Sequence, residues 1–259
     1  MGVLAGRRVA VLRAAGQGAD FAEALRKEGA EPVLCPVIAI IALPTCGILD
    51  AALANLASYD WIVFASANAV AAVAGRMAVL HQALPSRTQL AAIGPATAAE
   101  LRQRLCDADI VAGEHRAAGL AQSLAAEPGA RVLLPAGNLA GPELANELRG
   151  RGLLVDVVTA YHTVPDHDGI AMLAAELRGD ALDAVVFTSG STARFAVAGL
   201  GPAAMMALGN GPDRPAVVCI GPATAAAARE CGLAVHTVAD PSTTEGVMDA
   251  LRRWFAAGT

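Results

Sequence analysis

Aromatic side chains are scarce in this chain, at 3% of 259 residues, although hydrophobic residues reach 55%. Much of the apolar content is alanine, which is typical of Ala-rich helices packed on strands of valine, isoleucine and leucine. Long apolar runs are also missing. The best candidate, residues 61–75, is interrupted by serine and asparagine, so we predict no membrane span. Arg7, Arg8 and Arg13 interrupt the first apolar segment, which argues against a signal peptide.

Charge of one sign is not concentrated anywhere, and the formal net charge is only −5. Nucleic acid is therefore not an expected partner, because its binding normally needs a basic stripe. The five cysteines form no Cys-x-x-Cys pair; they are Cys35, Cys46, Cys106, Cys219 and Cys231. Two of them lie in strand-like runs, where buried free thiols are common. We expect reduced thiols and a cytoplasmic location.

Several motifs of well-known chemistry are absent from the sequence. There is no phosphate-binding G-x-x-x-x-G-K-[ST] loop, and Gly16-Gln17-Gly18 lacks the third glycine of a dinucleotide fingerprint. The segment Thr188-Ser189-Gly190-Ser191 does not match the nucleophile elbow G-x-S-x-G. The histidines are scattered and no paired carboxylates stand out. We therefore expect no metal and no cofactor, and chemistry without a strong acid, base or nucleophile.

What the chain does contain is an internal repeat. Val63-Phe64-Ala65-Ser66 returns as Val186-Phe187-Thr188-Ser189, an offset of 123 residues (186 − 63). Ile93-Gly94-Pro95-Ala96-Thr97-Ala98 returns as Ile220-Gly221-Pro222-Ala223-Thr224-Ala225, an offset of 127 (220 − 93). A period this long indicates a duplicated domain rather than a short structural repeat. The repeated segments are strand ends followed by polar helix starts, so two rims of donors are predicted, and two rims that faced each other would form a cleft.

Short β-branched runs alternate with Ala- and Leu-rich helical stretches along the whole chain. The predicted strands are residues 9–13, 32–37, 61–65, 89–93, 109–111, 132–135, 155–160, 184–188, 217–220 and 235–238. Predicted helices include residues 19–28, 95–106, 141–151, 222–231 and 244–255. Continuous apolar strands alternating with helices indicate an α/β fold with parallel sheets covered on both faces.

Ten strands divide into two sheets of five, and periodicity allows two divisions. Each domain could be one contiguous half of the chain. Alternatively, the first β-α-β unit could complete the last three strand–helix pairs and leave a middle domain of about residues 39–163. In that second scheme residues 35–38 and 161–165 would be the crossings, and both carry a proline, which suits a strand end that leaves a sheet.

The Gly-Pro-Ala-Thr repeat is predicted to bind anions. Gly94 and Gly221 permit a tight turn, proline fits the first helical position, and Thr97 and Thr224 place hydroxyls in the first turn. Free amide groups and the helix dipole favour an anion there, and the carboxyl ends of parallel strands are where ligands bind. An ordinary strand-to-helix connection is the alternative interpretation.

The second repeated pair also follows a strand end. Ser66-Ala67-Asn68 and Ser189-Gly190-Ser191 supply small hydroxyl or amide residues before a helix. Helix capping alone is the alternative interpretation, since serine and asparagine are preferred caps. Tyr161 could be a weak acid and donor, or it could simply pack a linker. Arg13 could clamp a carboxylate, or it could form a surface ion pair.

Together these residues resemble the uroporphyrinogen-III synthase family. The resemblance covers nearly the whole chain in order; it runs through Arg13, Leu25 and Gly29, Pro36, Phe64-Ala65-Ser66-Ala67-Asn68-Ala69-Val70, Ile93-Gly94-Pro95-Ala96-Thr97, residues 155–161 with Thr163, Phe187-Thr188-Ser189, Ile220-Gly221-Pro222-Ala223-Thr224 and the helix 244–251. No single motif is decisive, but their order and spacing together are fairly specific. One departure is Ala65, where the family more often has threonine, so a hydroxyl role at that position is weakened.

The resemblance implies two flavodoxin-like domains joined by a two-stranded linker near residues 35–40 and 160–165. It selects the second division, with residues 1–38 and 165–259 in one domain and 39–164 inserted as the other. It implies dehydrative cyclisation of hydroxymethylbilane, with inversion of the last pyrrole ring through a spiro intermediate, in tetrapyrrole biosynthesis. No cofactor is implied. We also expect a monomer that receives its substrate from hydroxymethylbilane synthase.

Two other functions compete with this interpretation. A two-domain protein that binds or senses a small anion without turnover would share the fold. A sugar-nucleotide transferase would need a diphosphate-binding glycine loop and a carboxylate for a ribose, and neither is evident in the sequence.

Overall fold

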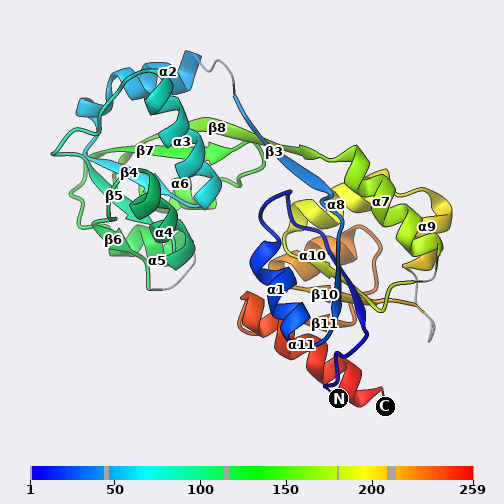
Figure 1. The fold of residues 1–259 in the computed structure, drawn as a ribbon. Helices are drawn as coiled ribbons and strands as arrows, with labels where there is room; N and C mark the ends of the chain where they lie inside the picture. The colour runs from blue at the N-terminus through cyan, green and yellow to red at the C-terminus, as the bar shows by residue number, and fades with distance from the viewer. Residues whose placement is uncertain (1, 44–46, 114–116, 180, 209–213, 259) are drawn as a thin grey trace. The chain divides into compact units, whose positions relative to one another are not determined.

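The structure, a computed structural model, describes residues 2–43, 47–113, 117–179, 181–208 and 214–258 (Figure 1). Cys46, expected to be a reduced thiol, lies outside the described residues. The chain divides into two compact units, Met1–Ala39 with Val164–Thr259 as unit 1, and Ile40–Thr163 as unit 2. The resemblance implies boundaries after residues 38 and 164, and we keep these as our proposal for the two domains.

Unit 1 is built on a five-stranded sheet of order β11-β10-β9-β1-β2. Its strands are β1 (Arg8–Val11), β2 (Glu31–Leu34), β9 (Ala184–Phe187), β10 (Ala216–Cys219) and β11 (Thr237–Val238). Every neighbouring pair in it is parallel. β1, β9 and β10 are buried almost throughout, which is why they read as continuous apolar runs.

Helices cover the sheet of unit 1. They are α1 (Ala19–Lys27), α7 (His167–Arg178), α8 (Gly190–Gly199), α9 (Pro202–Ala207), α10 (Pro222–Glu230) and α11 (Thr244–Ala257). Phe21 and Leu25 of α1 share one core with Val247 and Leu251 of α11 and with alternate strand residues such as Val186. α8 and α10 pack side by side, as α7 and α9 do.

Unit 2 is built on a sheet of order β3-β8-β7-β4-β5-β6. Its strands are β3 (Ile38–Ala42), β4 (Trp61–Phe64), β5 (Gln89–Ala92), β6 (Ile110–Val111), β7 (Arg131–Gly137) and β8 (Leu154–Pro165). All pairs from β8 to β6 are parallel. The prediction of an α/β fold with parallel sheets is therefore confirmed.

The prediction of two five-stranded sheets is wrong, because the second sheet has a sixth strand. The family resemblance implies a two-stranded linker here, and β3 does pair with β8, but periodicity treated this run only as a crossing and did not count it as a strand of the sheet. The physical reason is the length of β8, whose 12 residues exceed the 7 of β7 and offer a partner for the apolar run Ile38–Ala42.

Helices lie on both faces of the sheet of unit 2. They are α2 (Gly47–Ala54), α3 (Ala67–Val79), α4 (Pro95–Arg104), α5 (Ala117–Ser123) and α6 (Glu143–Gly150), with a short 3-10 turn, η1 (Leu56–Ser58). One core joins α2, α3 and α4 to Ile62, Phe64 and Val158 of the sheet. A second core joins α5 and α6 to Trp61 and Val63. Successive residues of β4 thus point to opposite cores, as the alternation of a strand requires.

The two sheets share one spatial order. The order β2-β1-β9-β10-β11 in unit 1 matches β8-β7-β4-β5-β6 in unit 2, although the strands follow one another differently along the chain. In unit 1 this is the flavodoxin-like order 2-1-3-4-5. The repeated segments of the sequence occupy corresponding strands, since β4 corresponds to β9 and β5 to β10.

Candidate active site

The predicted site residues lie at the carboxyl edges of the two parallel sheets. In unit 2, Ser66 follows β4, Gly94 follows β5, and Tyr161 lies near the end of β8. In unit 1, the corresponding positions after β9 and β10 are Ser189 and Gly221. This is the edge at which open α/β sheets bind ligands.

Ser66 and Tyr161 meet in unit 2. The Ser66 Oγ lies 3.2 Å from the phenol oxygen of Tyr161, and either hydroxyl can donate. Ser66 is also the N-cap of α3, because its extended backbone places Oγ to accept the N–H of Ala69 at 3.1 Å. Tyr161 is only 9% exposed and packs in the same core as Phe64. A phenol held beside a second hydroxyl can donate a proton and have its oxygen stabilised afterwards.

Ala67 and Asn68 form the first turn of α3, next to this pair of hydroxyls. Both are partly exposed, so their backbone and side chain stay accessible at the rim. Asn68 already has an interaction partner in the protein. Ala65, the position at which the chain departs from the family pattern, is exposed and carries no hydroxyl.

Gly94 and Gly221 cap α4 and α10 without any side-chain hydrogen bond, and proline follows each. Their backbones are nearly fully extended, at φ −177° and ψ 178° for Gly94 and φ −174° and ψ 174° for Gly221. A Cβ at Gly221 would collide with the Ser242 side chain, so close approach explains this glycine. The first N–H groups of both helices are left for water or a ligand.

Thr97 and Thr224 occupy the third position of these two helices. They are 4% and 5% exposed, and neither hydroxyl makes a hydrogen bond to another described residue. Every fully buried side-chain N or O atom in the described parts of the chain does have a hydrogen-bond partner, so the oxygen atoms of these two hydroxyls are not fully buried. The two hydroxyls must therefore retain access to solvent at the rim, where they remain available to a ligand.

Ser189 serves mainly as a helix cap. Its Oγ accepts the N–H of Thr192 at 3.2 Å, and the Thr192 hydroxyl accepts the N–H of Ser189 at 3.2 Å, which makes a capping box. Ser191 joins through an Oγ–Oγ contact of 2.9 Å. Gly190 lies close to the side chain of Ala227, since a Cβ there would be 3.1 Å from it. The sequence analysis missed Thr192, because the usual partner at that position is Glu or Gln.

Arg13 follows β1 and offers a cation at the same edge of unit 1. Its guanidinium lies 5.9 Å from the centre of the Phe21 ring and donates a long 3.5 Å hydrogen bond to Thr244. Burial lowers the pKa of Arg13, against the opposing charge of Asp20. Within the described parts of the chain Arg13 has no ion pair, so these residues lend no support to the alternative of a surface ion pair. Nothing in the sequence pointed to Thr244 as its contact.

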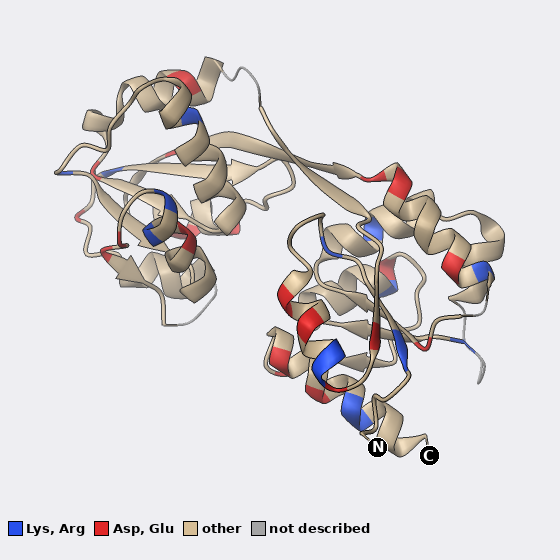
Figure 2. Ribbon diagram, in the orientation of Figure 1, with Lys and Arg blue, Asp and Glu red and all other residues tan. Residues whose placement is uncertain are grey.

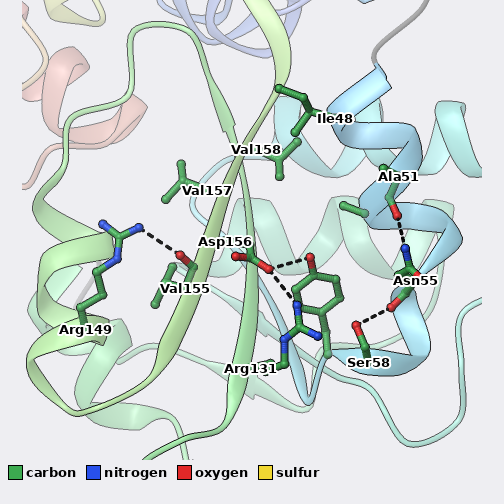
Figure 3. Close-up of a pocket in the computed structure, with 12 residues that line it drawn as sticks. Ile48, Ala51, Asn55, Ser58, Arg131, Arg149, Val155, Asp156, Val157 and Val158 are labelled. Atoms are coloured by element: carbon green, nitrogen blue, oxygen red, sulfur yellow. Dashed lines mark hydrogen bonds and ion pairs between the residues drawn. The ribbon is translucent and has the colours of Figure 1, made fainter.

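A cavity of about 650 Å³ in unit 2 lies away from these residues (Figure 3). Its lining includes Tyr59, which lies just before β4, Arg131, the first residue of β7, and Asp156, the third residue of β8. It thus lies toward the amino ends of the strands. None of the predicted site residues line it. Inside it, the Tyr59 hydroxyl donates to Asp156 at 2.8 Å and Arg131 reaches the same carboxylate at 3.2 Å.

Charges of both signs are interspersed over each unit (Figure 2). Among the described helices, none is both long and apolar enough to cross a membrane. Over the same residues, no cluster of three or more His, Cys, Asp or Glu side chains could hold a metal ion. Of the predicted site residues Arg13 alone has a charged side chain, and the others offer hydroxyl, amide or backbone N–H groups.

Comparison with known proteins places these features in one family. A family model described as uroporphyrinogen-III synthase HemD matches residues 19–249. The uroporphyrinogen-III synthase of Synechococcus elongatus is 31% identical over 97% of this chain and 96% of its own length. The porphyrin biosynthesis protein HemD of Ruminiclostridium josui is 27% identical over 96% of this chain, which spans only 48% of that protein.

Solved structures show the same fold. A mutant uroporphyrinogen III synthase from Thermus thermophilus superimposes with a TM-score of 0.65, at 23% identity, over 97% of this chain and 100% of that one. The enzyme from Helicobacter pylori gives a TM-score of 0.60 at 13% identity, over 94% of this chain and 97% of that one. With the family model and the Synechococcus relative, these findings show that the chain belongs to the uroporphyrinogen-III synthase family.

Proposed function

We propose that Tyr161 assists the loss of water from hydroxymethylbilane, and that the rim donors of each unit bind the carboxylates of this substrate. Family membership makes the protein a lyase of tetrapyrrole biosynthesis, a uroporphyrinogen-III synthase. The observation that carries the proposal is the 3.2 Å contact between the hydroxyls of Tyr161 and Ser66 at the carboxyl edge of the unit 2 sheet.

The reaction itself needs little help to begin. The lone pair of the terminal pyrrole nitrogen expels the hydroxyl group of the hydroxymethyl carbon, and the resulting cation is stabilised by resonance. Tyr161 donates its proton to the departing oxygen, so that water leaves and a phenolate remains. The Ser66 hydroxyl then donates to that phenolate oxygen. When the last carbon–carbon bond closes the macrocycle, a proton released from the substrate restores the phenol, and the atoms balance.

The difficulty lies in the regiochemistry. The same cation can close without an enzyme to give the isomer in which the last ring is not inverted. The protein must therefore hold the linear tetrapyrrole substrate in the conformation that leads to the spiro intermediate, which is catalysis by positioning. A site without a catalytic triad suits that task, because orientation rather than a strong acid decides the product.

Carboxylate binding is assigned to three kinds of donor. The N-termini of α4 and α10 lack side-chain caps, so their first N–H groups can donate hydrogen bonds to anions. Thr97 and Thr224 add hydroxyls in the same first turns. Arg13 adds a guanidinium without a carboxylate partner among the described residues. We assign Ser66, Ala67, Asn68, Ser189, Gly190 and Ser191 to the same rims as further contacts with the substrate.

The first experiment is a product ratio. Hydroxymethylbilane is generated in place by its synthase, and uroporphyrin III and I are separated after oxidation. We expect mostly isomer III. A ratio equal to the enzyme-free control, with saturable binding of the substrate, would overturn the synthase activity in favour of the anion-binding alternative.

The second experiment tests Tyr161 directly. Tyr161→Phe removes the hydroxyl but keeps the ring, and we expect kcat to fall by about 10²-fold, as for a well-placed acid. Tyr59→Phe is the matched control, because the chain has only 2 tyrosines and Tyr59 lines the cavity away from the site. An unchanged rate for Tyr161→Phe would remove Tyr161 from the mechanism, and a loss below about tenfold would make it an auxiliary donor.

We further propose that the protein is a cytoplasmic monomer and takes its substrate directly from hydroxymethylbilane synthase. Free cysteines support a reducing compartment, since Cys35, Cys106, Cys219 and Cys231 are all unpaired thiols. Sedimentation of the protein alone tests the monomer. Comparing isomer ratios for substrate that is generated in place and substrate that is added free tests the direct transfer.

A further inference from the structure

Strand β8 carries an irregularity immediately before Tyr161. Ala136 of β7 pairs with Thr159, but the next residue, Gly137, pairs with Tyr161. Ala160 is therefore an extra residue on β8, which is the pattern of a β-bulge. Bulges are known to re-aim side chains next to active sites.

The bulge decides which face of the sheet Tyr161 occupies. Val158 and Ala160 both pack in the core that contains Phe64 and the α3 side chains, as alternation requires. Strict alternation would place Tyr161 on the opposite face, toward the other core. With the extra residue, Tyr161 instead joins Ala160 in the same core. A shift of one residue thus turns the phenol toward Ser66, because the side-chain period of a strand is two.

Gly137 provides the space for the ring of Tyr161. A Cβ at Gly137 would lie 2.7 Å from Cζ, 2.8 Å from Cε2 and 2.9 Å from the phenol oxygen of Tyr161. Gly137 is not among the glycines with positive φ, so its backbone does not require glycine. The close approach of the aromatic ring is therefore the physical reason for glycine at this position.

Asn138 holds the strand on the far side of the bulge. Its backbone N–H donates to the carbonyl of Tyr161 at 3.2 Å. Its side chain accepts the N–H of Thr163 at Oδ1, at 2.7 Å, and donates from Nδ2 to the carbonyl of Thr163 at 3.4 Å. The amide side chain thus replaces a peptide group in pairing with Thr163, and the backbone N–H of Asn138 holds Tyr161, so Asn138 fixes two residues of β8 where the register has shifted.

We infer that Gly137 and Asn138 are positioning residues, which act through the bulge to hold the phenol of Tyr161 against Ser66. This inference rests on the proposed role of Tyr161. The expectation is that disturbing either residue moves the phenol and lowers kcat, while leaving the carboxylate-binding donors of the rims in place and KM nearly unchanged.

The first test is Gly137→Ala, compared with Gly75→Ala. Gly75 is an exposed residue of α3 with open space around its Cα, so alanine fits there. We expect Gly137→Ala to reduce kcat by about 10²-fold, the effect of displacing a reacting group by about 1 Å, with KM within about twofold. The Gly75→Ala variant should keep the activity of the unaltered protein.

A spectroscopic signal reports the position of the phenol independently of turnover. Incorporation of fluorotyrosine gives one resonance for each of the 2 tyrosines, and Tyr59→Phe assigns the signal of Tyr161. Ser66→Ala should shift that signal, because it removes the neighbouring hydroxyl. Gly137→Ala should shift the same signal, whereas Gly75→Ala should leave it unchanged.

Asn138 gives a graded second test that does not depend on the fold tolerating a Cβ at residue 137. Asn138→Asp keeps the shorter bond, in which Oδ1 accepts the N–H of Thr163, but loses the donor. Asn138→Leu loses both bonds. We expect kcat to fall in the order unaltered protein, Asn138→Asp, Asn138→Leu, with matching shifts of the Tyr161 signal.

The outcomes separate this inference from the proposed role of Tyr161. If Tyr161→Phe slows the reaction but Gly137→Ala and both Asn138 variants leave kcat and the fluorine signal unchanged, the positioning role is wrong and the role of Tyr161 survives. A second outcome is that the Gly137 and Asn138 variants shift the fluorine signal of Tyr161 but keep full kcat, and that Tyr161→Phe also keeps full kcat. The positioning role of Gly137 and Asn138 is then supported, and the catalytic role of Tyr161 is wrong. A rise in KM with unchanged kcat would assign Gly137 and Asn138 to substrate binding and overturn the inference.

Discussion

Asp60 accepts a hydrogen bond from the backbone N–H of Arg131 at 2.8 Å, which ties the start of β4 to the start of β7. The same tie occurs in unit 1, where Asp183 accepts the N–H of Arg8 at 2.8 Å between β9 and β1. Both members are offset by 123 residues (183 − 60 and 131 − 8). The two units therefore close the amino edge of the sheet in the same way, which supports the predicted duplication.

Loss of either aspartate should destabilise the fold. Asp60→Ala and Asp183→Ala each remove the acceptor of a strand N–H. We expect the free energy of unfolding to fall by about 1–3 kcal/mol for the partly buried Asp183 and by about 0.5–1.5 kcal/mol for the exposed Asp60. Asp183→Ala should cost more than Asp60→Ala, because Asp183 also pairs with Arg7 at 2.7 Å. Denaturant unfolding measures both effects.

The matched control is Asp107→Ala. Asp107 pairs with Arg102 at the surface, where both side chains are 73% exposed, and such pairs contribute about 0–1 kcal/mol. Equal losses for Asp107→Ala and Asp60→Ala would show that the backbone tie contributes no more than an exposed ion pair.

Substitutions of two buried threonines at helix starts, Thr192 and Thr224, should have different effects: one on the free energy of unfolding and the other on substrate binding. Thr192 bonds both the N–H and the carbonyl of Ser189, the latter at 2.7 Å, so Thr192→Val should cost about 0.5–2 kcal/mol of unfolding free energy. Thr224 makes no hydrogen bond to a described residue, so Thr224→Val breaks no such bond and should cost less unfolding free energy than Thr192→Val. Its effect should instead be a rise in KM for hydroxymethylbilane.

The stability of Thr192→Val and Thr224→Val is measured by thermal unfolding, and their KM for hydroxymethylbilane by steady-state kinetics. A destabilised Thr224→Val with unchanged KM would mean that its hydroxyl serves only the fold. The same pair of measurements on Thr97→Val tests whether the equivalent position of unit 2 behaves alike.

Part of the candidate site could be predicted from the sequence, because it depends only on which residues directly follow each strand. The spacing of the repeats placed Ser66, Gly94 and their counterparts after parallel strands, and parallel strands end at one edge. The contact between Ser66 and Tyr161 could not be predicted, because the residues are 95 positions apart and strand alternation places the phenol on the wrong face. Only the bulge at Ala160 brings them together.

Periodicity alone did not show that β3 is the edge strand of a sheet, for a related reason. A proline and a short apolar run are compatible with a crossing or with a strand, and pairing along β8 decides between them. The division into units likewise depends on long-range pairing. Periodicity alone left two divisions open, and only the family resemblance selected one.

The thiols should fall into protected and reactive groups. Burial raises the pKa of Cys35 and of Cys219 to about 11, so little thiolate is present at neutral pH. Cys106 is exposed as a residue, although partial desolvation of its thiol and the charges of Asp109 and Asp107 raise its pKa. We expect a thiol reagent to modify Cys106 in the native protein well before Cys35 or Cys219.

The labelling is followed by mass spectrometry of peptides, in a Cys46→Ser background so that only Cys35, Cys106, Cys219 and Cys231 can react. Cys231, which is partly exposed, should react at an intermediate rate. Rapid modification of Cys219 without unfolding would contradict the buried position of β10 in the sheet.

The phenol of Tyr59 should make the stability of unit 2 depend on alkaline pH. Burial, the hydrogen bond to Asp156 and the charge of Asp156 raise the pKa of Tyr59 from 10.0 to about 12, against the effect of Arg131. In the unfolded chain the phenol ionises near 10, whereas the folded protein keeps its proton. The stabilisation is therefore complete below pH 10 and is lost as the pH rises toward about 12.

The measurement is the free energy of unfolding against pH for the unaltered protein and for Tyr59→Phe, which has no phenol proton at this position. The difference between the two curves should be constant below pH 10 and should shrink above it, by at most roughly 3 kcal/mol at about 1.4 kcal/mol per pKa unit. Asp156→Asn removes the nearby negative charge, so the pKa of Tyr59 should fall and the pH window should narrow. Parallel curves for the unaltered protein and Tyr59→Phe through this range would show that the phenol ionises equally in both states, and the hydrogen bond to Asp156 would then contribute nothing to the proton affinity of Tyr59.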